Sequence, residues 1–239
     1  VGRALAARTY AREIDVVLFS SMVTASLALP LRGRLARAGV RMGTIANGLD
    51  VTLPVAPYVR VGKLPNGLTY YIQKNGRPEM RLELRLVVKA GSILEDEDQL
   101  GLAHFTEHMA FNGSTNFKRH ELVSYLQSIG VKFGRDLNAY TSFDQTVYML
   151  PIPTDSKEAV EKGFLVLEDW ASGITFNDED IESERGIVLE ELRMGKGAND
   201  RMNQVLYPKL FNGSRYAERL PIGKAEVLRT FKPVGLRGF

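Results

Sequence analysis

Residues 101–113 read GLAHFTEHMAFNG, and they hold two of the chain's three histidines with a carboxylate between them. In a helix, His104 and His108 lie one turn apart on one face, with Glu107 beside them. An adjacent stripe carries three apolar side chains that can pack into a core: Leu102, Phe105 and Met109. The stretch therefore predicts a helix that packs on one side and presents polar groups to a cavity on the other.

Two imidazoles at this spacing suit a tetrahedral zinc ion, whose catalytic form takes three protein ligands and leaves the fourth position to water. Glu107 is then placed to accept a proton from that water. The alternative is a solvated or partly buried His pair with ordinary partners. The order H-x-x-E-H, the inverse of the H-E-x-x-H zinc helix, is a hydrolase signature and favours the metal site.

Residues 101–113 resemble the zinc helix of the pitrilysin family of metallopeptidases, which includes insulysin and the mitochondrial processing peptidase. The resemblance extends from about residue 59 to 226 and is strongest to bacterial zinc proteases. It implies a zinc-dependent metalloendopeptidase with one Zn²⁺ per chain, Glu107 as the base, and peptides or unfolded polypeptides as substrates. It also implies a second homologous domain or subunit that closes on this one like a clam. A non-catalytic homologous subunit for peptide binding or assembly is the alternative, although such members typically lack motif residues that this chain keeps.

A predicted helix ending near residue 194 offers candidates for the third ligand. Its positions i, i+3, i+4 and i+7 combine two carboxylates with two apolar residues: Glu184, Ile187, Val188 and Glu191. Such a stripe normally faces a core, whereas Glu190 lies at roughly the opposite side. Because a buried carboxylate is costly unless paired or bound to metal, this geometry favours Glu184 or Glu191 over Glu190.

The resemblance covers this helix too, because residues 184–191, ERGIVLEE, are similar to the family's second motif. It implies that Glu191 completes the ligand set with His104 and His108, and that Glu184 supports a ligand histidine. The 83 residues from His108 to Glu191 exceed the family's usual spacing. Glu184, which is nearer to that spacing, is therefore the alternative ligand.

Residues 137–151, LNAYTSFDQTVYMLP, are rich in Tyr, Thr, Val and Phe and predict a long strand or a bent pair. In the resembled family, a similar segment is the sheet edge beside the zinc, along which substrate adds as an extra strand. The resemblance implies that Asn138, Ala139 and Tyr140 bind substrate. An ordinary core strand is the alternative.

Further strands are predicted at residues 58–63, 68–74 and 80–90. The first two form a hairpin because Asn66-Gly67 supplies the positive φ of a tight turn. A helix at 156–172 is expected to bury four side chains: Val160, Phe164, Leu167 and Trp170. Strands and helices that are grouped rather than alternating predict an α+β fold, with a mainly antiparallel sheet and helices packed on one face. The resemblance makes this one half of a clam-like metallopeptidase.

Two other polar groups are not expected to bind metal. The acidic residues 95–98 precede the zinc helix and are expected to favour its N-terminus. His120 heads a separate helix and is expected to be a capping or surface residue.

Composition narrows the class of protein. The absence of cysteine excludes disulfides, thiolate ligands and cysteine nucleophiles. Residues 1–50 contain seven Arg and three acidic residues, so the net charge of +3 arises there, and 24 basic and 25 acidic residues remain for the rest. Without a basic stripe, no nucleic-acid partner is expected.

Three segments are predicted along the chain: a leader at 1–50, a linker at 51–57 and a peptidase N-terminal catalytic domain at 58–239. The leader's apolar run 16–29 follows several arginines and resembles a secretory signal, being too short to span a membrane. A disordered leader is the alternative. An exported or periplasmic location is therefore expected, with a cytoplasmic one as the alternative. Residues 230–239, TFKPVGLRGF, do not resemble the family's continuation, so we expect a C-terminally truncated domain that hydrolyses peptides poorly by itself.

Overall fold

The computed structural model describes residues 16–19, 41–44, 59–77, 79–119, 121–129, 131, 138–195 and 197–239. The chain divides into two compact units, Val1–Lys74 and Asn75–Phe239. In the first unit, β1 (Val16–Phe19) pairs in parallel with β2 (Arg41–Thr44). The predicted linker 51–57 and most of the predicted leader lie outside the described residues, so that division of the chain stays a prediction.

The first unit also contains the predicted hairpin, formed by β3 (Val59–Lys63) and the antiparallel β4 (Thr69–Gln73). Gly67 has a φ of +88°, and the Leu64 N–H donates to the Leu68 carbonyl at 2.8 Å. The Asn-Gly turn is therefore confirmed, with glycine at the residue whose φ is positive.

In the second unit, β5 (Arg81–Val88), β6 (Asn138–Thr141) and β7 (Thr146–Pro153) form an antiparallel sheet in the order β5-β7-β6. Leu84 of β5 is buried, while the alternating charged side chains of that strand are exposed. Of the predicted segment 137–151, the described residues form the antiparallel pair β6 and β7, which is the bent-pair alternative. The predicted strand segments all form strands, but they are divided between two sheets rather than joined in one.

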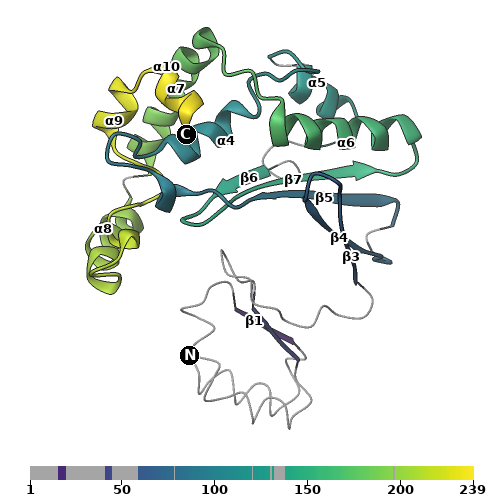
Figure 1. Cartoon of the computed structure of the whole chain (residues 1–239), viewed down its shortest axis with the longest axis horizontal. Helices are drawn as coiled ribbons and strands as arrows, with labels where there is room; N and C mark the ends of the chain where they lie inside the picture. Colours follow the sequence, from purple (N-terminus) through teal and green to yellow (C-terminus); the bar gives the residue numbers. More distant parts are fainter. Residues whose placement is uncertain are drawn as a thin grey trace. The chain divides into compact units, whose positions relative to one another are not determined.

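The helices of the second unit are α4 (Leu102–Met109), α5 (Glu121–Ser128), α6 (Lys157–Ser172), α7 (Asp178–Met194), α8 (Ala198–Leu210), α9 (Ala225–Thr230) and α10 (Pro233–Gly238), with 3-10 turns η2 (Ser92–Leu94) and η3 (Arg215–Ala217). Figure 1 shows α4, α5, α6 and α7 on the same side of the β5-β7-β6 sheet. The predicted α+β fold with helices on one face is confirmed. No helix among the described residues has the length and hydropathy needed to cross a bilayer.

Two hydrophobic clusters surround α4. One lies between the sheet and helices α5 and α6 and includes Leu150 and Trp170. The other joins α4 to α7, α9 and α10. The predicted apolar stripe of α4 belongs to this second cluster, and none of its three side chains is more than 1% exposed: Leu102, Phe105 and Met109. Because full burial of such a side chain contributes about 1.5–3 kcal/mol, the apolar side of α4 is firmly fixed.

Helix α6 packs through most of the predicted stripe, since Val160 and Leu167 are partly buried against the first cluster. Trp170 is buried, but Phe164 is 53% exposed. Gly163 faces the sheet instead, where a Cβ would lie 2.8 Å from Cγ1 of Ile152. The helix therefore approaches the sheet closely at a residue that has no side chain, which apolar periodicity does not detect.

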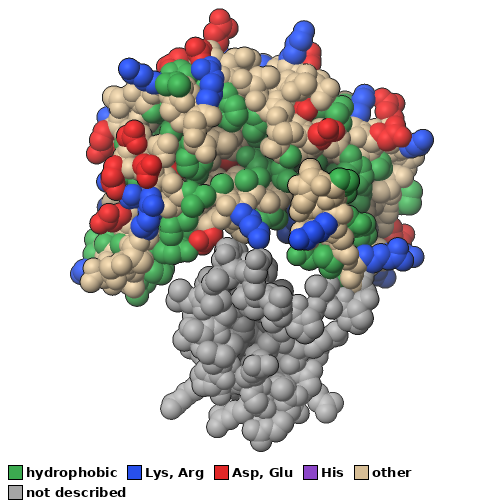
Figure 2. Space-filling model, viewed as in Figure 1, with side chains coloured by type: hydrophobic (Ala, Val, Ile, Leu, Met, Phe, Trp, Pro, Cys, Tyr) green, Lys and Arg blue, Asp and Glu red, His purple; other side chains and the backbone are tan. Residues whose placement is uncertain are grey.

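Charged side chains of both signs are interspersed along the helical margin of the face drawn in Figure 2. On the helices of the second unit, charged residues form pairs one helical turn apart, such as Glu158 with Lys162 at 2.8 Å and Glu190 with Arg193 at 2.5 Å. These pairs are typical of solvated helix surfaces.

Candidate metal centre

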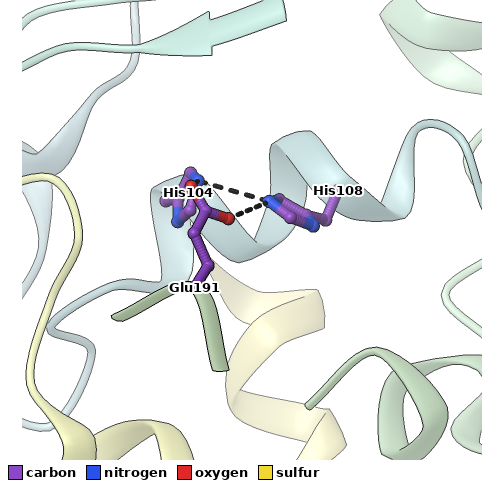
Figure 3. Close-up of side chains that lie close together, drawn as sticks. All are labelled: His104, His108 and Glu191. Carbon is purple, nitrogen blue, oxygen red and sulfur yellow. Dashed lines mark hydrogen bonds and ion pairs between the residues drawn. The ribbon is translucent and has the colours of Figure 1, made fainter. Parts of the chain in front are cut away.

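Helices α4 and α7 bring three ligand groups together, as Figure 3 shows for His104, His108 and Glu191. The two Nε2 atoms lie 3.3 Å apart. Nε2 of His108 is 3.3 Å from one Glu191 oxygen, and Nε2 of His104 is 3.7 Å from the other. One ligand atom from each residue lies within 4.8 Å of the others. Two imidazole nitrogens and a carboxylate that converge in this way fit a three-ligand zinc site with an open fourth position.

Glu184 lies on the other side of the His108 ring. Its Oε1 is 2.8 Å from Nδ1 of His108. A hydrogen bond at Nδ1 leaves Nε2 as the ligating atom and orients the ring. Because Glu191 faces both Nε2 atoms and Glu184 faces Nδ1, the geometry favours Glu191 as the ligand and Glu184 as the group that orients His108.

The predicted inward stripe of α7 is only partly correct. Glu184 and Val188 are buried, whereas Ile187 is 53% exposed. Half of the Glu191 side chain is exposed, which places it at the rim of the site rather than in a core. The argument from the cost of a buried carboxylate therefore applies to Glu184, and Glu191 has to be located by its distances to the histidines.

The two histidines differ in basicity. Burial, followed by the nearby charge of His108, lowers the pKa of His104 to about 4, against the opposing effect of Glu191. Burial also acts to lower the pKa of His108, but hydrogen bonds and charges from Glu184 and Glu191 outweigh it and raise that pKa to about 9. His104 is therefore neutral near pH 7, and a metal competes with one proton on His108.

Glu107 lies on the same helix with its carboxylate in the site. Burial raises the pKa of Glu107, although the hydrogen bond from Thr141 opposes the effect. That hydroxyl, on β6, donates to Oε2 of Glu107 at 2.6 Å. A carboxyl group with a raised pKa next to the ligand cluster is suited to proton transfer. The sequence did not predict that Thr141 would donate a hydrogen bond to Glu107.

A cavity of about 300 Å³ opens beside the cluster. Residues of α4, β6, α7 and a later loop line it: His104, Glu107, Ala139, Tyr140, Thr141, Glu191, Pro221 and Ile222. β6 is the last strand in the sheet order β5-β7-β6. Two of the three residues predicted to bind substrate, Ala139 and Tyr140, therefore reach the cavity. Asn138 does not line it, and its side chain accepts a hydrogen bond from the Ala139 N–H at 2.9 Å.

Sequence reasoning also missed Pro221 and Ile222. They reach the cavity because the following residue, Gly223, lies against Gly101 at the start of α4. A Cβ on Gly223 would be 2.4 Å from the Gly101 Cα, so only glycine permits this approach. Residues more than a hundred positions apart meet here, and the sequence carries no local signal for it.

The N-terminus of α4 is capped from the acidic cluster that precedes it. Oε1 of the fully buried Glu95 accepts a hydrogen bond from the Ala103 N–H at 2.9 Å. The capping role predicted for residues 95–98 is confirmed at this residue. Burial raises the pKa of Glu95 to about 7, although N–H groups of the helix and the charge of Arg219 oppose it. His120, which was not expected to bind metal, lies outside the described residues.

A family model described as insulinase, peptidase family M16, matches residues 71–221. The chain belongs to this family. The M16 chain is 43% identical over 178 residues to a PQQL-like zinc protease of Arabidopsis thaliana. This alignment covers 74% of the chain and 19% of the relative. The chain is 34% identical over 195 residues to the chloroplastic stromal processing peptidase of Arabidopsis thaliana, covering 80% of this chain and 15% of the relative.

The M16 fold is matched by the crystal structure of the first half of the periplasmic protease PqqL from Escherichia coli. The TM-score is 0.75 at 36% identity, over 78% of this chain and 40% of that one. The chain therefore spans less than a fifth of the two curated relatives and less than half of this solved half. The resemblance to the pitrilysin family is confirmed by the family match and by the similarity to this structure.

Proposed function

We propose that this chain is the zinc-binding catalytic domain of a metalloendopeptidase that hydrolyses peptides or unfolded polypeptides. His104, His108 and Glu191 are proposed to hold one Zn²⁺. Family membership supports the class of chemistry. The observation that carries the site is the convergence of two Nε2 atoms and the Glu191 carboxylate within 4.8 Å.

Zinc, when bound, polarises the scissile carbonyl and acidifies water. Glu107 is proposed to take a proton from the water as its oxygen attacks the carbonyl carbon. The same carboxyl group then gives that proton to the amine nitrogen as the C–N bond breaks. The Thr141 hydroxyl donates to Oε2 of Glu107 and so helps to orient the carboxylate that is proposed to carry the proton.

Asn138, Ala139 and Tyr140 are proposed to bind the substrate backbone as an added strand along β6. The position of β6 at the end of the strand order and the cavity beside it support this. The zinc-loaded Glu107→Gln variant tests it with an unstructured peptide. Amide NMR shifts should change in β6, and peptide binding that leaves β6 unperturbed would contradict the proposal.

Zinc content tests the ligand set. Purified protein should hold about one zinc per chain, and His104→Ala, His108→Ala or Glu191→Gln should lose it. Glu190→Gln is the matched control, because Glu190 is exposed and pairs with Arg193. A greater zinc loss in Glu184→Gln than in Glu191→Gln would exchange their roles. Zinc that is retained in both histidine variants would contradict the proposal.

Activity separates the enzyme from a non-catalytic binding subunit. We propose that turnover needs a second homologous half, which the description of the PqqL structure as a first half supports. The chain is assayed on an unstructured peptide alone and with a homologous half in trans. Zinc-dependent hydrolysis that Glu107→Gln abolishes supports the enzyme. Peptide binding without hydrolysis in both assays supports the alternative.

An exported location is also proposed, supported by the periplasmic relative and by the signal-like residues 1–29. The stromal relative supports a different compartment. N-terminal sequencing of the native protein tests the proposal, because a cleaved secretory signal leaves a new terminus near residue 28.

A further inference from the structure

Asn112 lies in the turn that follows α4, four residues after His108, and it is half-buried. Its Nδ2 donates to Oε2 of Glu184 at 2.7 Å and to the backbone carbonyl of His108 at 3.3 Å. Both partners are acceptors, so only the NH₂ end of the amide satisfies them. The contacts therefore determine the orientation of the side chain.

Glu184 divides its two oxygens between two partners. Oε1 faces Nδ1 of His108 at 2.8 Å, and Oε2 accepts from Asn112. The Glu184 side chain is 8% exposed, so water does little to satisfy it, and a buried carboxylate needs a donor at each oxygen. Among the described residues, Asn112 donates the hydrogen bond that Oε2 accepts.

Arg119 is a cation whose charge acts on Glu184, and its guanidinium is held by other partners. Burial acts to raise the pKa of Glu184, but the hydrogen bonds from His108 and Asn112 lower it, and the charge of Arg119 adds a smaller lowering effect. The guanidinium of Arg119 is bonded to Ser183 at 2.6 Å and lies 3.2 Å from Asp180. Loss of the Asn112 amide therefore removes the hydrogen bond that holds Oε2, and only the contact between Oε1 and His108 then orients the carboxylate.

The contacts form a closed ring: Asn112 binds the backbone of His108 and also the carboxylate that binds the His108 side chain. We propose that Asn112 is a positioning residue for the metal centre. It fixes the Glu184 carboxylate, and through it the orientation in which Nε2 of His108 faces His104 and Glu191. This inference rests on the proposed zinc site and extends it to a residue that touches neither metal nor substrate.

Two substitutions remove the amide in different ways. Asn112→Asp keeps the shape but places a second carboxylate against Glu184, and Asn112→Leu removes all polarity. The chain offers a matched control in Asn116, which lies in the same connection and donates through Nδ2 to Oδ1 of Asp169 at 2.7 Å. Asn116→Asp and Asn116→Leu make the same chemical changes next to a carboxylate that does not contact a ligand histidine.

The experiment measures the zinc dissociation constant by competition with a chromophoric chelator, together with the visible spectrum of the Co²⁺-substituted protein. Thermal unfolding of the metal-free proteins checks that each variant is folded. Both Asn112 variants should bind zinc 10–100-fold more weakly, which is typical when the support of a ligand histidine is lost. Their Co²⁺ spectra should change, and the Asn116 variants should keep the wild-type affinity and spectrum.

Each other outcome has a definite meaning. Asn112 variants that bind zinc within threefold of wild type would overturn the inference and leave the zinc site standing. Equal weakening in the Asn112 and Asn116 variants would also overturn it, because the effect would then belong to the whole turn. If the wild-type protein binds no zinc, the proposed function fails, and this inference fails with it.

Discussion

Replacement of Glu95 by glutamine should change how the stability of the protein depends on pH. Glu95 caps α4 from a fully buried position, and within the part of the chain that the structure describes its Oε2 has no hydrogen-bond partner. Burial raises the pKa of this carboxyl from 4.5 to about 7, against the N–H groups and Arg219 that favour the charged form. Glutamine keeps an acceptor for the Ala103 N–H and cannot ionise.

The sign follows from proton binding. Below pH 4.5 the carboxyl is protonated in the folded and the unfolded chain. Between pH 4.5 and about 7 the unfolded chain releases the proton while the folded chain keeps it, so the free energy of unfolding falls as pH rises. At about 1.4 kcal/mol per pH unit, the loss reaches about 3 kcal/mol above pH 7. The Glu95→Gln variant lacks this loss.

Urea unfolding of wild type and Glu95→Gln at a series of pH values from 4.5 to 8 measures the effect. Relative to wild type, the unfolding free energy of Glu95→Gln should increase by about 3 kcal/mol between pH 4.5 and pH 8. Glu97→Gln is the control: the hydrogen bond and charge of Arg219 lower the pKa of this exposed carboxyl, so its contribution to stability changes mainly below pH 4.5. The difference in unfolding free energy between wild type and Glu97→Gln should therefore stay nearly constant above about pH 5.5. Parallel curves for wild type and Glu95→Gln would refute the reasoning.

Three further substitutions test contacts around the site. Thr141→Val should lower kcat about 10- to 100-fold in whichever assembly hydrolyses peptides, because the Glu107 carboxylate loses a hydrogen bond. Its zinc content should not change. Thr141→Ser, which keeps the hydroxyl, should keep most of the rate. Trp170→Phe should cost about 1–3 kcal/mol in urea unfolding followed by circular dichroism, since it leaves a buried carbonyl at the end of α4 without its donor. Gly223→Ala should destabilise the protein by more than Gly213→Ala does, because both have positive φ but only the former has backbone within 3 Å of a new Cβ.

Features of the site that depend on local spacing could be predicted from the sequence. The helical period predicted the His104–His108 pair and the buried stripe of α4, and the structure shows both. The Asn-Gly dipeptide predicted the hairpin turn, and Gly67 has the expected positive φ. Asn112 follows the same logic, because it is four residues beyond His108. That spacing places Asn112 one helical turn beyond His108, and it could have indicated their contact from the sequence.

Features that depend on how elements approach one another could not be read from spacing. Periodicity predicted Phe164 and Ile187 as buried, but each is 53% exposed. For Phe164 the reason is that α6 turns Gly163 toward the sheet. The choice between Glu184 and Glu191 has the same character: both lie on α7, and only their positions around the His108 ring distinguish them.

The placement of α4 shows why the motif alone does not make the site. The helix has eight residues, and isolated helices shorter than about 12–15 residues are marginal in water. Its N-terminus is held by Glu95, the carbonyl of Ala110 at its end accepts from Trp170 Nε1 at 3.0 Å, and its buried stripe packs on α7, α9 and α10. These contacts come from residues 95 to 236. The histidine spacing supplies the ligand chemistry, but the distances that make a three-ligand cluster depend on most of the second unit being folded.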